Sequence, residues 1–600
     1  MKLLKGQIKH GPKYKFGVEI PRSKKHAEQL DKDNGNTLWG DTLQTEIKQI
    51  LAFETFCILP KGQVEFPDKH KYQFVPLHFV FDVKFDLRRK VRCIAEGNWN
   101  DPDDAEVFSG VVSIESVRIG LFAAVLNDLL LCAADVGNAF LHGMTRELVY
   151  TVAGPEWGPL AGCIMIAVRS IYGLKTSAAC FHEVLAVSLL KLGFTPSQAD
   201  PNMWIKDCGT HYEYISTYVD DLLVMSKDPM AIIRELEKEY PLKGVGVPQY
   251  YLGGDITTGR NKNGKRFITQ SARTYIKRIC EKIESLLGWK LKNYGSPLES
   301  DYHPELDLST LLSPDNTSKY RMMVGSLNWV VTLGQFDVHY ATQTMARYNM
   351  VPRQGHFEMM KRIFGYLKHH AKMQIVYDTE LPGHMDYQAV TYNWFEHYGH
   401  CTEELPHDMP VPKGNPVGIT AFFDADHAGC LSTRRSTTGI LTFLNNTHVK
   451  SYSKRQSTVE SSTYSSETVA GRIAVETAIE MRYKLRMLGI PVLGSCLLFG
   501  DNMSMVISTT IPSSALKKKH NAIGYHRVRE AIAARIIDLL HVPSRANLAD
   551  LLTKPLGPQI YKQVMELFWF PTLPRIGKHD GECQSEINNE TVDDGQGTTI

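Results

Sequence analysis

The sequence predicts a multidomain α+β protein. Its 600 residues are too many for one hydrophobic core, because single cores stop growing at roughly 250–300 residues. Hydrophobic residues make up 43% of the chain and charged residues 22%, as in ordinary globular proteins. Segments with a two-residue apolar period alternate with segments of helical period, and an irregular Pro-, Gly- and His-rich stretch at 382–416 separates two groups of them.

The N-terminal part is expected to hold a polar lead-in followed by strands and helices. We interpret residues 1–60 as the lead-in, with 1–22 poorly ordered. Between Phe74 and Ala95 the apolar pattern predicts two strands joined by the basic turn Arg88 to Lys90. The next predicted elements are helices at 115–134 and 177–192, then strands at 212–218 and 222–225 around the adjacent acids Asp220 and Asp221.

Helical patterns are predicted to dominate residues 230–372, and a new domain is expected to start near Val417. The tail after Lys578 is acidic and polar, which favours disorder. The elements predicted in the new domain are strands at 418–424, 439–444 and 447–452, a helix at 465–488, a strand at 496–499, helices near 503 and at 522–534, a strand at 538–542 and a last helix from 546.

The composition argues against a strongly basic protein, a structural zinc protein and a membrane-spanning protein. The formal net charge of +2 means that any basic surface must be local; candidate patches are Lys24-Lys25, Arg88 to Arg92, Arg273 to Lys292 and Lys517 to Lys519. The 11 Cys form no CxxC pair and no Cys/His array at zinc spacing, so no structural zinc is predicted. The longest apolar stretch, Leu121 to Ala134, is interrupted by polar residues and too short to cross a bilayer.

Asp220 and Asp221 indicate metal chemistry. Adjacent acids between apolar strands repel one another, and a divalent cation removes that repulsion. Nucleotidyl transfer uses Mg²⁺ held by carboxylates from separate elements, and Asp135, at the end of another apolar strand, can supply the third. An isolated Asp-Asp pair is more often a solvated turn, so the surrounding sequence has to decide between the two interpretations.

Three motifs, in order, resemble those of copia-type LTR-retrotransposon Pol polyproteins. Tyr218-Val219-Asp220-Asp221 is similar to the catalytic hairpin of reverse transcriptases, and the segment from Asp135 to Gly143 is similar to their first catalytic motif. Ser170-Ile171-Tyr172-Gly173-Leu174-Lys175-Thr176-Ser177 resembles the Ser-Leu-Tyr-Gly-Leu-Lys-Gln-Ser of copia-type elements. The resemblance extends over about Asn34 to Gly557.

This resemblance implies roles for individual residues of a polymerase site. Asp135, Asp220 and Asp221 would ligate two Mg²⁺ ions, with Mn²⁺ as an alternative. Four further residues would bind the incoming nucleotide: Arg92 through its phosphates, Phe140 under the sugar where it excludes a 2′-hydroxyl, Gly173 by letting the backbone approach, and Tyr218 beside the catalytic acids. Without the resemblance, Phe140 is as well explained as a core aromatic residue.

Four further acids are expected to converge from four elements: Asp424, Glu467, Asp501 and Asp550. Such a cluster suits two metal ions and a water that attacks a phosphodiester. The segments around them, Asp424 to Gly429, Arg434 to Gly439, Gly500 to Asn502 and Leu548 to Leu556, resemble those of copia-type RNase H domains. The resemblance implies that all four acids are catalytic metal ligands, again for two Mg²⁺ ions.

His526 and the neighbouring Lys517, Lys518 and Lys519 are predicted to contact the nucleic-acid backbone, because Tyr525 to Glu530 resembles a basic helix of the family. An ordinary helix-face His remains the alternative. The sequence also departs from the family pattern at Gly137-Asn138, at Ala178 to Phe181 and at Thr468. None of these changes removes a predicted metal ligand.

The fold implied by the resemblance is an α+β right-hand polymerase with fingers, palm and thumb, followed by a connection region and a mixed α/β RNase H-like domain. The expected boundaries are 1–60 for the lead-in, 61–240 for fingers and palm, 241–318 for the thumb-like part, 319–416 for the connection region, 417–557 for the RNase H-like domain and 558–600 for a largely disordered tail.

The implied function is RNA-directed DNA synthesis together with hydrolysis of RNA in an RNA–DNA hybrid. The expected partners are template RNA, primer, hybrid and dNTPs, with other polyprotein-derived chains such as capsid or integrase and no membrane, in a cytoplasmic particle or the nucleus. The alternative is a decayed or domesticated copy that only binds nucleic acid. A structural capsid-like protein needs no converging acids, so the seven acids count against that class.

Overall fold

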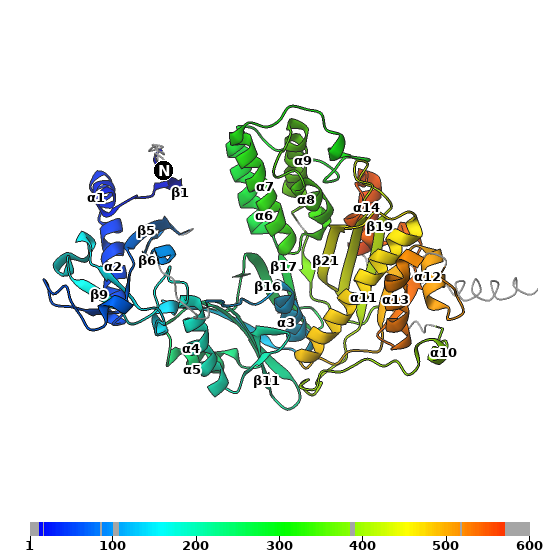
Figure 1. Ribbon diagram of the computed structural model, residues 1–600, viewed down its shortest axis with the longest axis horizontal. Helices are drawn as coiled ribbons and strands as arrows, with labels where there is room; N and C mark the ends of the chain where they lie inside the picture. The colour runs from blue at the N-terminus through cyan, green and yellow to red at the C-terminus, as the bar shows by residue number, and fades with distance from the viewer. Residues whose placement is uncertain are drawn as a thin grey trace, which may run out of the picture.

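The computed structural model describes residues 11–569, except 16, 85–86, 100–106, 372, 384–389 and 517–518. The disorder expected for residues 1–22 and for the tail therefore falls partly outside the described residues. The described chain forms an N-terminal unit, a central sheet, a group of long helices and a C-terminal mixed sheet, arranged from left to right in Figure 1. This confirms the predicted α+β class. In the described part, every helix is too short or too polar to span a bilayer.

The N-terminal unit is built from two helices packed on strands. The predicted hairpin is confirmed as β5 (Leu77–Val83) and β6 (Arg89–Ala95). Helix α2 (Leu38–Ala52) buries Trp39 and Ile47 against it, and α1 (Lys24–Asp33) packs on α2, so this part of the lead-in shares the core of the unit. A four-stranded sheet completes the unit, in the order β3 (Phe56–Ile58), β9 (Ile164–Ala167), β8 (Val149–Val152) and β4 (Gln73–Phe74).

The central sheet has six strands in the order β10 (Thr195–Ser197), β11 (Asp200–Asp207), β12 (Tyr212–Tyr218), β13 (Asp221–Ser226), β7 (Leu130–Val136) and β14 (Leu242–Gly246). Alternate residues face opposite sides of a strand. Accordingly, Leu223 and Met225 of β13 pack with helix α3 (Ile114–Leu126), whereas Leu222 and Val224 pack with α4 (Ser177–Lys191) and α5 (Pro229–Glu237).

The helix expected at 115–134 ends earlier than the sequence predicted. Asn127 caps α3, and Asp128 adopts a left-handed backbone conformation with φ +51°. The chain reverses there, and residues 130–134 become part of strand β7. The helical period of the apolar residues predicts one continuous helix, but the Asn127-Asp128 pair marks a turn within it.

The prediction that helices dominate residues 230–372 was wrong for its first part. Strand β14 joins the central sheet, and the next strands form a separate sheet of β15 (Tyr250–Tyr251), β16 (Gly254–Arg260), β17 (Arg266–Ser271) and β18 (Ile375–Val376). The turn between β16 and β17 contains Gly264 at φ +75°, which favours a tight turn over a helix. The helices that follow are α6 (Arg273–Leu287), α7 (Pro314–Thr332), α8 (His339–Ala346) and α9 (Gln354–His370).

The C-terminal domain is a five-stranded mixed sheet in the order β21 (Thr447–Arg455), β20 (Thr437–Leu444), β19 (Ile419–Asp426), β22 (Cys496–Gly500) and β23 (Ile537–His541). The first three strands are antiparallel, whereas β19, β22 and β23 are parallel. Phe423 faces α11 (Thr463–Met487) and its neighbours α12 (Met503–Thr510) and α13 (Ala522–Ala533). Phe422, on the other face, stacks on Phe499.

The end of the domain corrects two predictions. The helix expected from Ala546 is instead two short 3₁₀ turns, Ser544–Ala546 and Leu548–Leu552. Residues 558–569, expected in a largely disordered tail, form helix α14 (Pro558–Trp569). Tyr561, Val564 and Met565 are buried against the sheet and the connection helices, and the Tyr561 hydroxyl donates to the Asp337 carbonyl at 2.7 Å.

Arg118 on α3 ties three parts of the molecule together. Its guanidinium donates to the Thr332 carbonyl of α7 at 2.6 Å and to the Val449 carbonyl of β21 at 3.1 Å. The side chain is buried, and burial lowers its pKa. Because one apolar core runs from α3 into the C-terminal sheet, Arg118 lies inside a continuous interface rather than at a hinge.

Replacing Arg118 with Met should keep most of the volume but remove both hydrogen bonds. We expect the free energy of unfolding to fall by about 3 kcal/mol, since each buried bond to a charged group contributes roughly 1.5–3 kcal/mol. Urea unfolding followed by tryptophan fluorescence measures this change. The control Lys319→Ala removes only an exposed pair with Asp315 and should change stability by less than about 0.5 kcal/mol; equal effects of the two variants would contradict the assignment.

Candidate functional site

The first candidate site lies where three strands of the central sheet end. Asp135 and Asp221 are directly opposite one another on β7 and β13, and Tyr218 faces Asp221 across the β12–β13 turn. Val219 in that turn has φ +57°, a conformation that non-glycine residues adopt rarely, and Val136 N–H donates to the Asp220 carbonyl at 2.8 Å. The tight turn thus holds the predicted acids at one edge of the sheet.

The carboxylates of this site perturb one another. Burial, with Asp220 and Asp135 nearby, raises the pKa of Asp221 to about 6. Burial and Asp220 also raise the pKa of Asp135, against the opposing effect of nearby lysines that include Lys243. Among the described residues, the carboxylate oxygens of these three acids do not all lie within 4.8 Å of one another. The three acids of this site are therefore more widely spaced than Asp424, Glu467 and Asp501 of the second site described below.

The residues expected around a nucleotide lie beside this edge. The Phe140 ring packs on the Tyr172 ring with centroids 4.7 Å apart, and the Arg92 guanidinium lies 4.5 Å from the centroid of the same Tyr172 ring. Phe140 and Tyr172 thus come from the two motifs quoted above, and Arg92 from β6. The contacts place Arg92 and Phe140 together, while their roles toward a nucleotide stay predictions.

Gly173 is required for a reason that the sequence did not reveal. Its φ is +99°, and a Cβ would lie 2.0 Å from the Ala95 carbonyl oxygen at the end of β6. The neighbouring Ala95 N–H donates to the Tyr172 carbonyl at 2.7 Å. Close packing of this turn on the hairpin is therefore sufficient to explain the glycine, and an approach to a nucleotide remains a separate prediction.

The second candidate site lies on the C-terminal sheet. Asp424 near the end of β19, Glu467 on α11 and Asp501 just after β22 have carboxylate oxygens that all lie within 4.8 Å of one another. Asp550 in the 3₁₀ turn reaches the same place through Lys554, whose ammonium lies 2.7 Å from an Asp550 oxygen and 3.2 Å from an Asp424 oxygen. The structure thus brings together all four predicted acids.

Glu467 is the most constrained of these acids. It is 2% exposed, and its Oε2 has no hydrogen-bond partner among the described residues, while Oε1 accepts only a long bond of 3.4 Å from Ala425 N–H. Burial, Asp424 and Asp501 raise its pKa well above the ordinary value. Burial and Asp424 likewise raise the pKa of Asp550 to about 7. An unpaired buried oxygen among acids fits a divalent cation, which prefers oxygen ligands.

Three residues at this site received no role from the sequence. Lys554 neutralises part of the acidic charge, and Thr553 Oγ1 donates to Asp424. Asp426, two residues after Asp424, is partly buried and accepts a hydrogen bond from Thr437 N–H; desolvation raises its pKa to about 8. All three lie inside the motifs quoted above, so the signal was present, but only the arrangement in space shows what they contact.

The residues predicted to bind nucleic acid are only partly described by the structure. Lys517 and Lys518 lie outside the described residues, and Lys519 is exposed. His526 is exposed on α13, where its Nδ1 lies 2.7 Å from the Tyr398 hydroxyl. Tyr398 belongs to the irregular segment 390–416, so sequence order gave no indication of this contact. Backbone contact by His526 stays a prediction.

Comparison with known proteins agrees with these motifs. Residues 62–288 match the family model described as reverse transcriptase (RNA-dependent DNA polymerase). The Retrovirus-related Pol polyprotein from transposon RE1 of Arabidopsis thaliana is 27% identical over 92% of this chain and 35% of that protein. The corresponding polyprotein from transposon TNT 1-94 of Nicotiana tabacum is 27% identical over 88% of this chain and 37% of that protein. The chain thus spans about a third of the length of these curated relatives.

Two solved structures also show similarity. The foamy viral protease-reverse transcriptase in complex with double-stranded DNA has a TM-score of 0.45 and 12% identity, and the match covers 84% of this chain and 69% of that one. RNase H1 from Halobacterium salinarum NRC-1 has a TM-score of 0.18 and 18% identity, and the match covers 22% of this chain and 93% of that one.

Replacing Glu467 with Gln should stabilise the metal-free protein at pH 8. The pKa of folded Glu467 lies above the ordinary 4.5, so the folded state binds the extra proton above that pH and loses stability as the pH rises. We expect a gain of about 1–3 kcal/mol at pH 8 that shrinks toward pH 5. Thermal unfolding in EDTA at both pH values measures it.

Glu476→Gln is the matched control, because Glu476 lies on the same helix but is about half exposed and paired with Arg472. It should show no such pH-dependent gain. Addition of Mg²⁺ should stabilise the native chain more than the Glu467→Gln variant. A destabilising Glu467→Gln change at pH 8 would argue against mutual repulsion at this site.

Proposed function

We propose that this chain is a fragment of a copia-type retrotransposon Pol polyprotein, with its reverse transcriptase region at residues 62–288, and that it is an RNA-directed DNA polymerase with RNase H activity. The observation that carries the proposal is the pair of separate acidic sites, one on each major sheet. Each has the carboxylate ligands that two-metal phosphoryl chemistry requires.

In the polymerase site, Asp135, Asp220 and Asp221 would hold Mg²⁺, which when bound would supply Lewis-acid activation of a primer 3′-hydroxyl and stabilise charge on a triphosphate. The chain's own residues position the substrate around that edge. Arg92 and Phe140 both contact the Tyr172 ring, and in this proposal Arg92 binds the nucleotide phosphates while Phe140 lies under the sugar. The pKa of Asp221 is raised first by burial and then by Asp220 and Asp135, and a cation would relieve the repulsion among these acids.

In the second site, Asp424, Glu467, Asp501 and Asp550 would hold divalent ions, which when bound would activate water for cleavage of an RNA strand. Lys554 contacts Asp424 and Asp550 and lowers the repulsion between them. We propose that Lys554 also competes with a cation for these oxygens, because one ammonium and one metal ion cannot occupy the same place beside Asp424. The unpaired Glu467 oxygen supports metal binding at this site.

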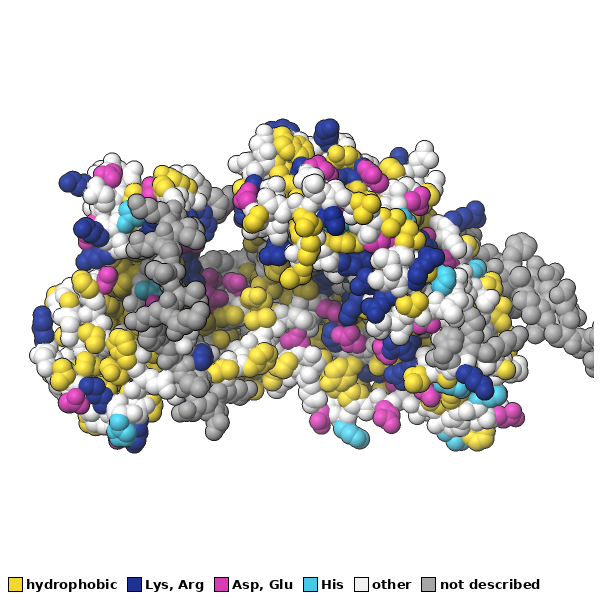
Figure 2. Space-filling view, turned by 45° about the horizontal axis from the view of Figure 1, so that its top comes forward, with side chains coloured by type: hydrophobic (Ala, Val, Ile, Leu, Met, Phe, Trp, Pro, Cys, Tyr) yellow, Lys and Arg dark blue, Asp and Glu magenta, His cyan; other side chains and the backbone are white. Residues whose placement is uncertain are grey.

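The proposed substrates are template RNA, primer, dNTPs and the RNA–DNA hybrid. Figure 2 shows Lys and Arg side chains gathered on one face of the right-hand part of the molecule, although the net charge is only +2. Local basic charge is what backbone recognition of a hybrid requires. Contact with other chains of the polyprotein, and location in a cytoplasmic particle or the nucleus, follow from the same proposal.

Primer extension on poly(rA)/oligo(dT) tests the two sites separately. Asp220→Asn should reduce DNA synthesis by at least about 100-fold, since removal of a metal ligand costs several kcal/mol of transition-state stabilisation, while hydrolysis of labelled RNA in a hybrid continues. Asp501→Asn should have the opposite effect. The exposed Asp315→Asn is the control for both reactions.

No synthesis and no hydrolysis by folded native protein that still binds hybrid would overturn the proposal. That outcome would identify the chain as a decayed copy that retains only nucleic-acid binding. Loss of both reactions in each single variant would show that the two sites do not act independently.

Phe140→Val should relax the choice of sugar at the polymerase site. A smaller side chain leaves room for a 2′-hydroxyl, so the ratio of rNTP to dNTP incorporation should rise by at least about tenfold, which corresponds to 1.4 kcal/mol of discrimination. The ratio is measured in competition within one reaction, so a general loss of activity cancels. An unchanged ratio in an active variant would show that Phe140 is only a packing residue beside Tyr172.

A further inference from the structure

The turn between β11 and β12 carries three potential metal ligands on one face. Cys208 N–H donates to the His211 carbonyl at 3.0 Å, which sets the two residues opposite each other at the base of the turn. Glu213 follows His211 by two residues on β12, and side chains two apart on a strand face the same side. The local hairpin geometry is therefore sufficient to bring the thiol, the imidazole and the carboxylate together.

Their ligand atoms are close enough to share one ion. The Cys208 sulfur, a ring nitrogen of His211 and a Glu213 oxygen all lie within 4.8 Å of one another. His211 Nε2 is 3.9 Å from Glu213 Oε1, beyond hydrogen-bond distance. This nitrogen is buried and has no hydrogen-bond partner among the described residues. A buried, unsatisfied nitrogen that faces a thiol and a carboxylate needs an explanation.

The surroundings hold these ligands in place. The Thr210 hydroxyl lies 3.1 Å from His211 Nδ1. In the tautomer that donates its Nδ1 proton to Thr210, His211 presents the lone pair of Nε2 toward the cluster. Glu213 Oε1 accepts hydrogen bonds of 2.7 Å from Ser226 Oγ and from Lys227 N–H. Such outer contacts are the ones that orient metal ligands in proteins.

We propose that Cys208, His211 and Glu213 bind one Zn²⁺ ion. Thiolate and imidazole ligands favour zinc over Mg²⁺ or Ca²⁺, which prefer oxygen alone. Three protein ligands leave a fourth position for water. On binding, the Cys208 thiol releases its proton to solvent and its sulfur forms the bond to zinc. The spacing Cys-x₂-His-x-Glu differs from paired-cysteine motifs, which is why the sequence alone predicted no zinc.

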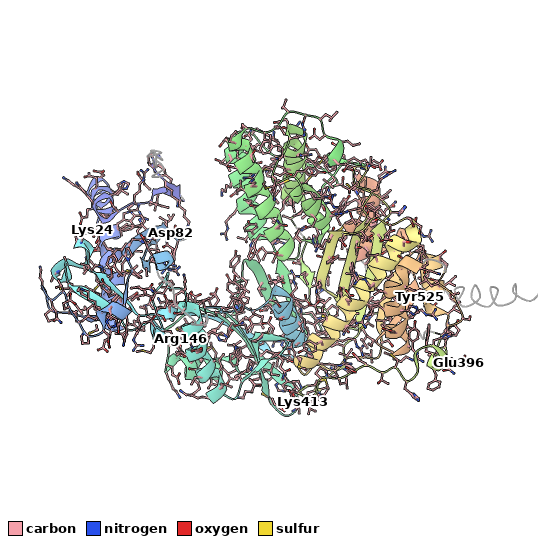
Figure 3. All side chains as sticks on the ribbon, viewed as in Figure 1. Lys24, Asp82, Arg146, Glu396, Lys413 and Tyr525 are labelled. Atoms are coloured by element: carbon pink, nitrogen blue, oxygen red, sulfur yellow. The ribbon has the colours of Figure 1, made fainter. Side chains whose placement is uncertain are left out.

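The ion would fix the turn where the central sheet meets the segment before the C-terminal domain. Tyr212, between two of the ligands, donates its hydroxyl proton to the Val411 carbonyl at 2.9 Å. Lys413 lies 5.4 Å from the centroid of the Tyr212 ring and pairs with Asp207. Figure 3 labels Lys413 below the central strands, Tyr525 on the C-terminal domain and Glu396 in the segment that precedes that domain. Zinc would thus stabilise the turn at this junction, apart from both acidic sites.

Titration of the metal-free full chain with Co²⁺ and then Zn²⁺ tests the proposal. Cobalt bound to a thiolate gives a near-ultraviolet charge-transfer band that the all-oxygen acidic sites cannot give. We expect one such Co²⁺ per chain, displaced by Zn²⁺, and a higher melting temperature with Zn²⁺. Cys208→Ser should abolish the band, and His211→Gln should weaken Zn²⁺ binding by at least about tenfold.

Cys57→Ser is the matched control, because Cys57 is an exposed cysteine on β3. It should keep the band, the zinc affinity and the gain in melting temperature. Absence of the band from folded native protein, or its persistence in Cys208→Ser, would overturn the proposal. Circular dichroism of each variant separates loss of the metal from loss of the fold, and polymerase activity plays no part in the test.

Discussion

Repulsion between clustered carboxylates is the constraint on which the rest of this structure depends. Asp424, Glu467 and Asp501 lie within 4.8 Å of one another, and Asp221 is directly opposite Asp135. Such placements are unfavourable until a cation arrives, so rigid sheets must hold them. The apolar layers on both faces of each sheet supply that rigidity, and the tight turn at Val219 and the contact from Lys554 limit the remaining freedom.

The C-terminal domain is not attached as an independent unit. Its sheet shares one core with α3 of the central sheet and another with the connection helices and α14. Polar contacts reinforce the same boundary: Tyr214 donates to the Leu488 carbonyl, and Lys484 pairs with Glu115. The irregular segment before Val417 therefore follows a surface already fixed by packing, and Glu403 holds it there through Arg482 and Arg486.

Sequence reasoning succeeded where local pattern and structure agree. Apolar periodicity and short motifs can be recognised in the sequence alone. They predicted the order of strands and helices from Val417 to β23 and the acidic turn at Asp220-Asp221. Sequence reasoning failed at β14 and at α14, because an edge strand and a terminal helix are stabilised by distant partners, β7 and Asp337 respectively. It also failed at the β16–β17 hairpin, where the turn at Gly264 was not recognised. The contact of Tyr398 with His526 and the packing need for Gly173 were equally invisible.

Arg118 helps to hold the two acidic sites at a fixed distance from each other. Since its guanidinium joins α3 to both α7 and β21 inside a continuous core, the edge that carries Asp135 and the edge that carries Asp424 cannot drift apart independently. A duplex that contacts both edges would have to match the distance between them. Under the function proposed above, the number of base pairs between the site of synthesis and the site of hydrolysis on such a duplex would be set by the protein's interior rather than by the nucleic acid.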